Sequence, residues 1–531
     1  MKRFSLFIIL FWGLCLGVFS QEKEFEPPRL VVGIKVEGFQ PEHIQQMWKY
    51  FTPGGFRKIV SESVVVKNVM HNIVSAGNSA DMATIMTGSF PFYHGVSGDY
   101  FYSRLDNQTF SVLYDKDERG IGTKEKYSAR RLLCSTFTDE IRMKNSLSQV
   151  HSIAINPEDA IMMGGHNATS VTWIDDVSNR WATSTYYERG LSRWADMMNA
   201  NGRFNQISSE RWTPSAGIST YLYPTVKGLR SVPFSYNPIE KNGTNQSQTI
   251  LRNTPAANTL VAELARSVFE NEKLGTDKHT DILMLQFNLK IPNQVGVGLN
   301  FAEQEDIYIR LDRDLQNLIS LINSRVDENK VLYFFIGSSM DVHSPIELGK
   351  NQIPAGFFNA DRALALLNTY LMAIYGNEKW ISGYYGKNIF LNRKKIEEKK
   401  LDWNEFRERV TDFLIEFEGV QSAYSTTDIL SFSGDKSDVR AKFRNSYHKN
   451  TSGDISISLM PGWIEVDNNG RVVGDANSPQ QFFPFYIMQK NLSPTSIDMI
   501  YNSTDIAPTI SSLMGVPFPN ASVGNVIQLT K

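Results

Sequence analysis

The sequence predicts an α/β fold in which a mostly parallel central sheet carries helices on both faces. Four short apolar runs indicate buried strands, at residues 29–36, 150–155, 281–287 and 330–336. Sequence of helical periodicity lies near each run, and alternation of strands with helices is typical of a parallel sheet. With 531 residues and 41% hydrophobic content, the chain is long enough to bury a large core.

The first strand and one later helix show these patterns clearly. The run at residues 29–36 is rich in β-branched residues, comes directly after Pro27 and Pro28, and is followed by sequence with a helical pattern. Between Glu303 and Ile322, apolar residues recur at helical spacing and charged residues lie between them. This spacing predicts a helix that faces the core rather than a functional surface.

Two stretches are expected to be insertions into this core. Residues 191–256 are rich in Asn, Ser, Gly and Pro, which favours a loop-heavy cap, and a second insertion is predicted at residues 344–452. The mature chain, residues 21–531, is then a single domain. Its core is expected in residues 30–190, 257–343 and 453–531.

The N-terminus has the pattern of a signal peptide. Lys2 and Arg3 precede an apolar run at residues 4–19, and small residues stand before Gln21. Residues 1–20 are therefore predicted to be removed, which implies export to the periplasm or the extracellular space. An uncleaved membrane anchor is the alternative, but the run is shorter than the roughly 20 residues that span a bilayer. No later segment is predicted to cross a membrane.

The charge and the cysteine content argue against a nucleic-acid partner and against a disulfide within the chain. The formal net charge of −2 shows no basic excess, which argues against a nucleic-acid partner. Cys15 leaves with the predicted signal peptide, so Cys134 is the only remaining cysteine and no disulfide can form within the mature chain. Stability is therefore expected to come from the core.

Short motifs along the whole mature chain resemble those of one enzyme family. They include Met86-Thr87-Gly88, Gly165-His166, and residues 181–187, 504–510 and 515–524. In these motifs the chain is similar to the single-chain alkaline phosphatases that bacteria secrete, within the wider phosphatase and phosphodiesterase superfamily. The resemblance implies an alkaline-phosphatase-like core and a reaction in which two zinc ions activate a hydroxyl nucleophile and stabilise the leaving oxygen.

Aligned on these motifs, the positions of the family's zinc ligands carry different residues. The first ligand, an aspartate after the first strand, corresponds to Glu37, whose extra methylene displaces the carboxylate. The other ligand positions correspond to Ile291, Val295, Ser338, Ser339 and Ala476. Apolar side chains offer no electron pair to a metal, and serine is a poor zinc ligand. We therefore expect no zinc cofactor.

The positions that attack and bind phosphate have changed as well. The family's nucleophile corresponds to Asn78, and an amide cannot be phosphorylated, although the adjacent Ser79 has a suitable hydroxyl. A lysine and an arginine that bind phosphate oxygens in the family correspond to Asn156 and Glu158. A carboxylate in place of a cation repels a phosphate dianion. An asparagine of the family's site becomes Asp99, which adds negative charge.

The sequence is consistent with three functions. The first is an exported, catalytically inactive protein that keeps the scaffold in order to bind a protein, a glycan or a small ligand. The alternative is a divergent phosphate-ester hydrolase, a phosphatase or phosphodiesterase, that uses Ser79 with Glu37, Asp81 or Asp99 and one or no metal ion. The third, a structural subunit of an envelope assembly, has no sequence signature. The replaced ligand positions favour the first.

A few other polar residues have both a functional and a structural interpretation. Asp341 and His343 form an Asp-x-His pair that a shift in register would offer to a metal, but a solvated loop pair is the more common case. His94, which precedes a glycine, is expected to pack a turn. Cys134 is expected to be a core residue.

Overall fold

The computed structural model describes most of the chain from residue 26 to residue 529. The described ranges are 26–74, 77–217, 221, 234–237, 251–290, 301–337, 345–435, 438–470, 472–473 and 482–529. Within these ranges, no helix is both long and apolar enough to cross a membrane. The predicted signal peptide and the pair Asp341 and His343 lie outside them. Five of the predicted ligand positions also lie outside them, namely Ile291, Val295, Ser338, Ser339 and Ala476.

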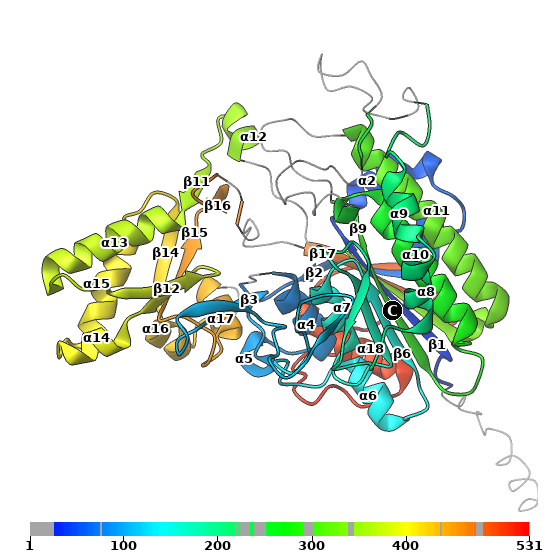
Figure 1. The fold of residues 1–531 in the computed structure, drawn as a ribbon, viewed down its shortest axis with the longest axis horizontal. Helices are drawn as coiled ribbons and strands as arrows, with labels where there is room; N and C mark the ends of the chain where they lie inside the picture. The colour runs from blue at the N-terminus through cyan, green and yellow to red at the C-terminus, as the bar shows by residue number, and fades with distance from the viewer. Residues whose placement is uncertain are drawn as a thin grey trace, which may run out of the picture.

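A ten-stranded mixed sheet forms the centre of the larger lobe, on the right in Figure 1. Across the sheet the strands follow in the order β18 (Thr495–Asn502), β2 (Val64–Met70), β17 (Phe482–Met488), β10 (Val331–Gly337), β1 (Leu30–Glu37), β9 (Asp281–Asn288), β6 (Val150–Ala154), β7 (Ser170–Ile174), β8 (Trp181–Ser184) and β5 (Gly120–Ile121). The strands from β10 to β7 are parallel, and antiparallel pairs lie on either side of them. The predicted α/β fold with a mostly parallel sheet is therefore confirmed.

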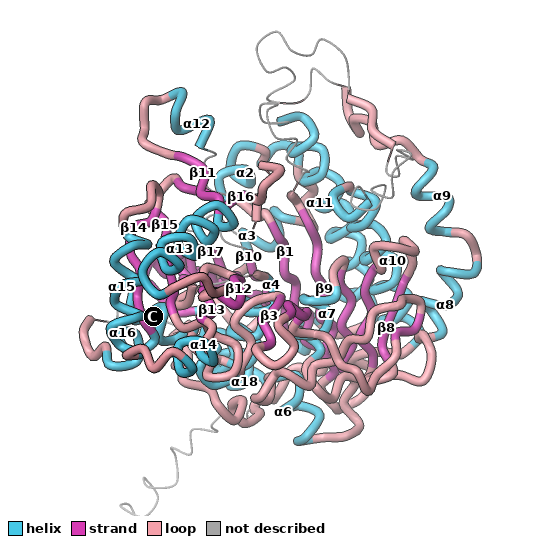
Figure 2. Tube along the Cα trace, turned by 60° about the vertical axis from the view of Figure 1, so that its left-hand side comes forward, coloured by secondary structure: helices cyan, strands magenta, loops and turns pink. Residues whose placement is uncertain are grey.

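Helices cover both faces of this sheet, because side chains alternate along each strand and both sets are apolar. In β1, Leu30, Val32, Ile34 and Val36 lie in one hydrophobic core and Val31 lies in another. Figure 2 shows β1 and β9 side by side between these two layers. The first core packs under α2 (Pro41–Gln46), α3 (Phe56–Glu62), α8 (Arg193–Ala200), α9 (Arg203–Ser209), α10 (Pro255–Asn271) and α11 (Phe301–Arg325). The second packs under α4 (Asn78–Thr87), α6 (Phe137–Lys144), α7 (Pro157–Gly164) and α18 (Ile506–Met514).

The helix predicted between Glu303 and Ile322 is confirmed as part of α11. Its apolar positions, among them Leu311 and Leu315, are fully buried. Helix α11 packs against α10, and α10 in turn contacts α8. Helices α8 and α9, from the first predicted insertion, therefore contribute to the core of the large lobe.

A second lobe, on the left in Figure 1, is built largely from the second predicted insertion, and we call it the inserted lobe. Its sheet has the order β12 (Ile381–Tyr385), β13 (Asn388–Leu391), β15 (Ile455–Leu459) and β14 (Val420–Ser425). It packs with α13 (Ala360–Tyr375) and α15 (Trp403–Ile415) around a separate hydrophobic core. Because β15 begins after residue 452, this lobe also uses residues that the sequence assigned to the main core.

The remaining short elements connect and extend the two lobes. Strand β12 of the inserted lobe contacts β3, and α17 contacts α5, so the lobes meet along this side. The ranges of these elements are α5 (Pro91–His94), β3 (Tyr100–Ser103), β4 (Gln108–Ser111), α12 (Pro345–Lys350), β11 (Gly356–Asn359), α14 (Arg393–Glu398), α16 (Thr426–Ser431), α17 (Val439–Ser446) and β16 (Trp463–Val466).

The carboxyl ends of β1, β2, β6, β9 and β10 meet at one edge of the large sheet, because these strands point in the same direction. Helix α4 follows β2 and helix α7 follows β6, so both helices begin at this edge. In open α/β sheets, ligands bind outside the carboxyl ends of the strands. The candidate site is therefore expected here.

Candidate functional site

Glu37, the last residue of β1, is held by two partners. Its Oε1 lies 3.2 Å from Nζ of Lys290, and its side chain also hydrogen-bonds the side chain of Asn78 at the start of α4. Burial alone would raise the pKa of Glu37, but attraction to Lys290 and Lys35 and the hydrogen bonds outweigh burial and lower the pKa. The structure thus brings together two of the predicted site positions, Glu37 and Asn78.

A buried lysine lies on the same face of β1 as Glu37. Side chains alternate along a strand, so residues 35 and 37 both point toward α4 and α7. Lys35 is only 5% exposed, and its Nζ lies 2.5 Å from Oδ1 of Asp159 in α7. Burial alone would lower the pKa of Lys35, but attraction to Asp159 and Glu37 outweighs burial and raises the pKa. The chain therefore supplies its own positive charge at this edge.

Asn156, a predicted site position, caps α7 and joins this network. Its Oδ1 accepts the backbone N–H of Asp159 at 2.7 Å, and its Nδ2 donates to Oδ2 of Asp159 at 3.0 Å. An asparagine is a favourable N-cap because its side chain satisfies a free N–H of the first turn. Both carboxylate oxygens of Asp159 are consequently engaged, one by Lys35 and one by Asn156.

The N-terminus of α4 is occupied by a carboxylate of the chain itself. Oδ1 of Asp99 accepts the backbone N–H of Ser79 at 2.8 Å. Gly77, the N-cap, has a φ of +135°, and a Cβ at this position would lie 2.0 Å from Oδ2 of Asp99. Only glycine allows this close approach. Helix N-termini attract anions, and here Asp99 provides the anion.

Ser79, the nearest hydroxyl to the predicted nucleophile position, is fully buried. In the described part of the chain, its Oγ forms no hydrogen bond. A substrate reaches this hydroxyl only after α4 or its neighbours move. Asn78, which is half-buried, lies nearer to the surface and faces Glu37 instead.

Glu158, at a predicted phosphate-binding position, is half-buried near the start of α7. Burial and the nearby charge of Asp99 raise the pKa of Glu158 to about 8, although Arg252 opposes the shift. The carboxyl is therefore largely protonated at neutral pH. A neutral or negative acid thus stands where the resemblance places a cation.

His94 and Cys134 lie in the core. His94 is fully buried, and its Nδ1 accepts the backbone N–H of Val96 at 3.2 Å. Burial lowers the pKa of His94 to about 3, so the ring is neutral and packs the turn that follows α5. Cys134 is buried and burial raises the pKa of its thiol.

The described residues include only one of the six positions that the resemblance assigns to ligands of two zinc ions. Among them, no three His, Cys, Asp or Glu side chains converge in a way that would bind a metal ion. Glu37 is the one ligand position that lies within the described ranges, and its carboxylate is engaged by Lys290 and Asn78. We derive no catalytic step through zinc, and the expectation that no zinc binds stays a prediction.

Lys35, Asp159 and Lys290 are site residues that the sequence patterns did not single out. Lys35 lies within an apolar strand, and a lysine in a buried strand needs a partner, because burying an unpaired charge is costly. That signal was present in the sequence. The identity of the partner was not, because Asp159 is 124 residues away along the chain.

The large sheet, the helices on both faces and the inserted lobe define a phosphoesterase fold of the alkaline phosphatase type. The chain matches the family described as type I phosphodiesterase / nucleotide pyrophosphatase over residues 31–473. This match covers more than half of the chain, and the chain belongs to this family.

Two bacterial relatives and one solved structure support the same assignment. The chain is 27% identical to alkaline phosphatase PafA of Elizabethkingia meningoseptica, over 99% of this chain and 98% of that protein. It is 26% identical to alkaline phosphatase PhoV of Synechococcus elongatus, over 94% of this chain and 92% of that protein. The crystal structure of PafA matches with a TM-score of 0.84 at 26% identity, over 94% of this chain and 98% of that chain. The predicted resemblance is therefore confirmed.

Proposed function

We propose that this protein keeps the alkaline phosphatase fold without the two-zinc reaction, and acts as an exported binding protein. The main support for this proposal is that the charged groups at the edge of the large sheet are already paired with other groups of the chain. The ammonium of Lys35 lies among carboxylates, and the carboxylate of Asp99 occupies the N-terminus of α4. An ammonium supplies positive charge without a metal cation, and a carboxylate at a helix N-terminus satisfies N–H groups that would otherwise be free to bind a phosphate oxygen.

The charges at this edge also disfavour a phosphate dianion. The positive charge of Lys35 is neutralised by Asp159, and that of Lys290 by Glu37. A dianion would then meet the carboxylate of Asp99 at the helix N-terminus, and the largely protonated Glu158 at the start of α7 offers it no positive charge. Two like charges 4 Å apart repel by roughly 4 kcal/mol at an effective dielectric constant of about 20. Tight phosphate binding is therefore not expected.

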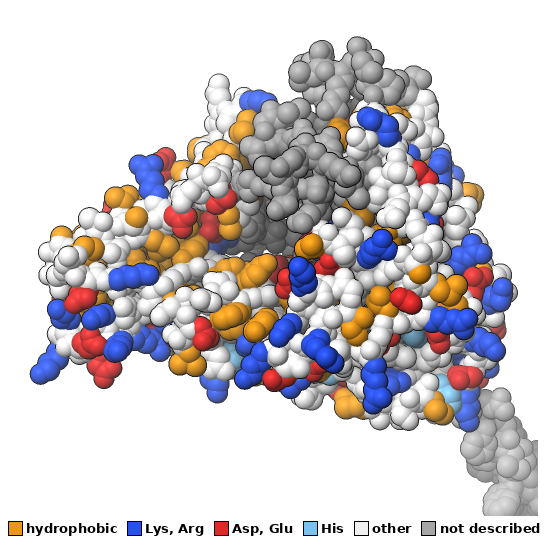
Figure 3. Space-filling view, viewed as in Figure 1, with side chains coloured by type: hydrophobic (Ala, Val, Ile, Leu, Met, Phe, Trp, Pro, Cys, Tyr) orange, Lys and Arg blue, Asp and Glu red, His pale blue; other side chains and the backbone are white. Residues whose placement is uncertain are grey.

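The proposed location and partner class follow from the N-terminal sequence and the surface. The signal-peptide pattern of residues 1–20 supports export. On the face shown in Figure 3, basic and acidic side chains are interspersed over the described surface. This mixture supports a protein, glycan or small ligand as partner rather than a nucleic acid.

A second candidate function is phosphate-ester hydrolysis that uses Ser79. The comparisons by themselves favour it, because PafA and PhoV are named alkaline phosphatases and the family is that of phosphodiesterases. In the structure, the unbonded hydroxyl of Ser79 and the raised pKa of Glu158, about 8, supply a nucleophile and a proton carrier. This reaction requires Ser79 to become exposed.

Turnover and metal content separate the two candidates. The mature protein is incubated with 4-nitrophenyl phosphate and bis(4-nitrophenyl) phosphate, with and without added zinc, and its bound metal is measured by mass spectrometry. We expect no stoichiometric zinc and no turnover above background. Turnover that disappears in Ser79→Ala but not in Ser511→Ala, a matched loss of a buried unbonded hydroxyl, would support the second candidate. Two equivalents of zinc with turnover that survives Ser79→Ala would contradict both.

A further inference from the structure

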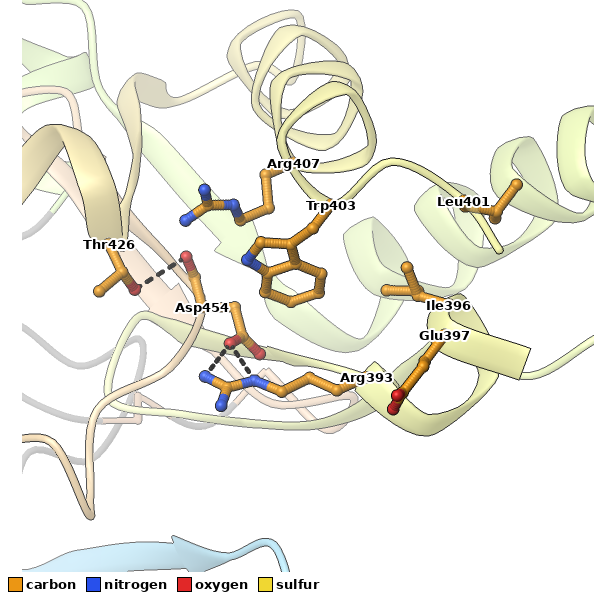
Figure 4. Close-up of a pocket in the computed structure, with 8 residues that line it drawn as sticks. All are labelled: Arg393, Ile396, Glu397, Leu401, Trp403, Arg407, Thr426 and Asp454. Atoms are coloured by element: carbon orange, nitrogen blue, oxygen red, sulfur yellow. Dashed lines mark hydrogen bonds and ion pairs between the residues drawn. The ribbon is translucent and has the colours of Figure 1, made fainter. Parts of the chain in front are cut away.

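A cavity of about 420 Å³ lies in the inserted lobe and shares no lining residue with the site at the edge of the large sheet. Figure 4 shows that its walls come from α14, α15, the start of α16 and the segment before β15. The volume suits a small molecule. Its walls combine four charged groups with an aromatic and aliphatic surface. The charged groups are Arg393, Arg407, Asp454 and the exposed Glu397, and the apolar surface comes from Trp403, Ile396 and Leu401.

Asp454 is fully neutralised before any ligand enters. It is 1% exposed, and its Oδ1 accepts hydrogen bonds from Nε and Nη2 of Arg393 at 2.9 Å and 2.5 Å. Its Oδ2 accepts the backbone N–H of Leu391 at 2.8 Å and lies 3.0 Å from Nη1 of Arg104. Two guanidinium groups, those of Arg393 and Arg104, therefore share the one carboxylate of Asp454.

Arg407 adds a second positive charge that has no ion pair within the described part of the chain. It is 6% exposed, and its Nη2 donates to Oδ1 of Asn404 at 2.5 Å. Its Nε is buried and has no hydrogen-bond partner among the described residues. Burial lowers the pKa of Arg407, although Asp428 and Asp454 attract it at longer range. A buried guanidinium without a carboxylate is costly, so it marks a place where an anion is expected.

Trp403 gives the cavity a flat apolar wall between the two guanidinium groups. The Cζ of Arg393 lies 5.6 Å from the centre of the Trp403 ring, and the Cζ of Arg407 lies 5.2 Å from it. Ile396 and Leu401 extend the apolar surface. This wall is a flat apolar surface next to the guanidinium group of Arg407.

From this arrangement we infer that the cavity binds a small organic oxyanion, a carboxylate or phosphate carried on a flat apolar body. The guanidinium plane of Arg407 matches either oxyanion, since both offer two oxygens to a pair of N–H groups. Trp403, Ile396 and Leu401 bind the apolar body. The inference holds whether or not the edge of the large sheet retains hydrolytic activity, because it concerns binding alone.

The test measures binding of three naphthalene derivatives, which share the flat body and differ in the polar group, to the full mature protein by isothermal titration calorimetry. The probes are 1-naphthoate, 1-naphthyl phosphate and the neutral 1-naphthamide. We expect at least one of the two anions to bind about tenfold more tightly than the amide. The anion that binds more tightly identifies the oxyanion. Equal binding of the anions and the amide, or no binding of any probe at about 1 mM, would overturn the inference.

Variants locate the binding in this cavity. Arg407→Met should weaken the anion about tenfold or more, Arg407→Lys should weaken it less, and the amide should be unaffected by either. Arg409→Met is the matched control, because Arg409 lies on the same helix and pairs with Glu405 at the surface. If Arg407→Met does not fold, Trp403→Leu at the cavity wall should weaken all three probes. Anion affinity that is unchanged in Arg407→Met or in Trp403→Leu would contradict the inference.

Discussion

The edge of the large sheet and the cavity of the inserted lobe differ in whether their buried charges are paired. At the edge, the chain provides a partner for each principal charge: Asp159 for Lys35, Lys290 for Glu37 and the N-terminus of α4 for Asp99. In the cavity, Arg407 is buried without a carboxylate partner among the described residues. Internal pairing stabilises the fold and leaves little charge to offer a ligand, whereas a buried charge without an ion pair is stabilised further when an anion binds.

The largest effect is expected from breaking the buried pair at the edge. Lys35→Met leaves Asp159 buried without its counter-charge, and should lower the free energy of unfolding by about 3–5 kcal/mol. Adding Asp159→Asn should restore most of the loss, because the uncompensated charge is then gone. Urea unfolding of the three proteins measures this.

Lys67→Met is the control for the loss of a lysine, because Lys67 pairs with Asp498 on the surface of β2 and β18. Exposed pairs contribute about 0–1 kcal/mol, so this variant should resemble the unchanged protein. If Lys35→Met and Lys67→Met had equal effects, the buried pair would not distinguish the edge from an ordinary surface.

A smaller effect is expected from removing the carboxylate that occupies the N-terminus of α4. Asp99→Ala removes the acceptor of the Ser79 N–H and should lower the free energy of unfolding by about 1–2 kcal/mol. Asp99→Asn keeps an oxygen acceptor and should cost less. Thermal unfolding of both, with Asp412→Ala at the surface of α15 as the reference, tests whether Asp99 acts as a cap. Equal losses for Asp99→Ala and Asp412→Ala would contradict this role.

The fold and part of the edge were predictable from the sequence, and the charge pairing was not. Apolar runs alone locate β1, β6, β9 and β10 within a residue or two, because burial on both faces leaves little choice of side chain. Alignment places Glu37 and Asn78 together, since Glu37 ends β1, Asn78 follows β2, and both strands end at the same edge. The pairing of Lys35 with Asp159 depends on how α7 packs over β1, and no local pattern encodes that packing. The cavity around Arg407 likewise forms only when α14, α15, the start of α16 and Asp454 pack together in the inserted lobe, and no local pattern encodes that packing.

The raised pKa of Glu158 provides a test of the edge that depends on pH. Its folded pKa of about 8 lies above the unfolded value of about 4.3, so folding favours the protonated form. The resulting stability is present below about pH 4.3 and is lost as the pH rises through about 8. Glu158→Gln stays neutral, so it should raise Tm relative to the unchanged protein by about 2 °C near pH 9 and by less near pH 5.

Calorimetry at the two pH values measures the difference for Glu158. Asp99→Asn should reduce the effect of Glu158→Gln, because the charge of Asp99 is one of the causes of the raised pKa. A Tm difference that does not change with pH would show that Glu158 titrates normally and that the edge is more open to solvent than its half-buried side chain indicates.

The ion pair of His166 and Asp139 depends on pH, because the His166 ring loses its positive charge as the pH rises. Nδ1 of His166 lies 2.9 Å from Oδ2 of Asp139, and Nε2 lies 2.7 Å from the carbonyl oxygen of Leu132. Burial alone would lower the pKa of His166, but these bonds outweigh burial and raise the pKa. The stability from the charged ring is fully present below the unfolded pKa of about 6.5 and is lost as the pH rises through the higher folded pKa. The ring is partly exposed, so His166→Gln should cost about 1 kcal/mol near pH 5.5 and less near pH 8.5. A cost that grows with pH would mean that the neutral ring is the stabilising form, and that pairing at His166 differs from pairing at Lys35.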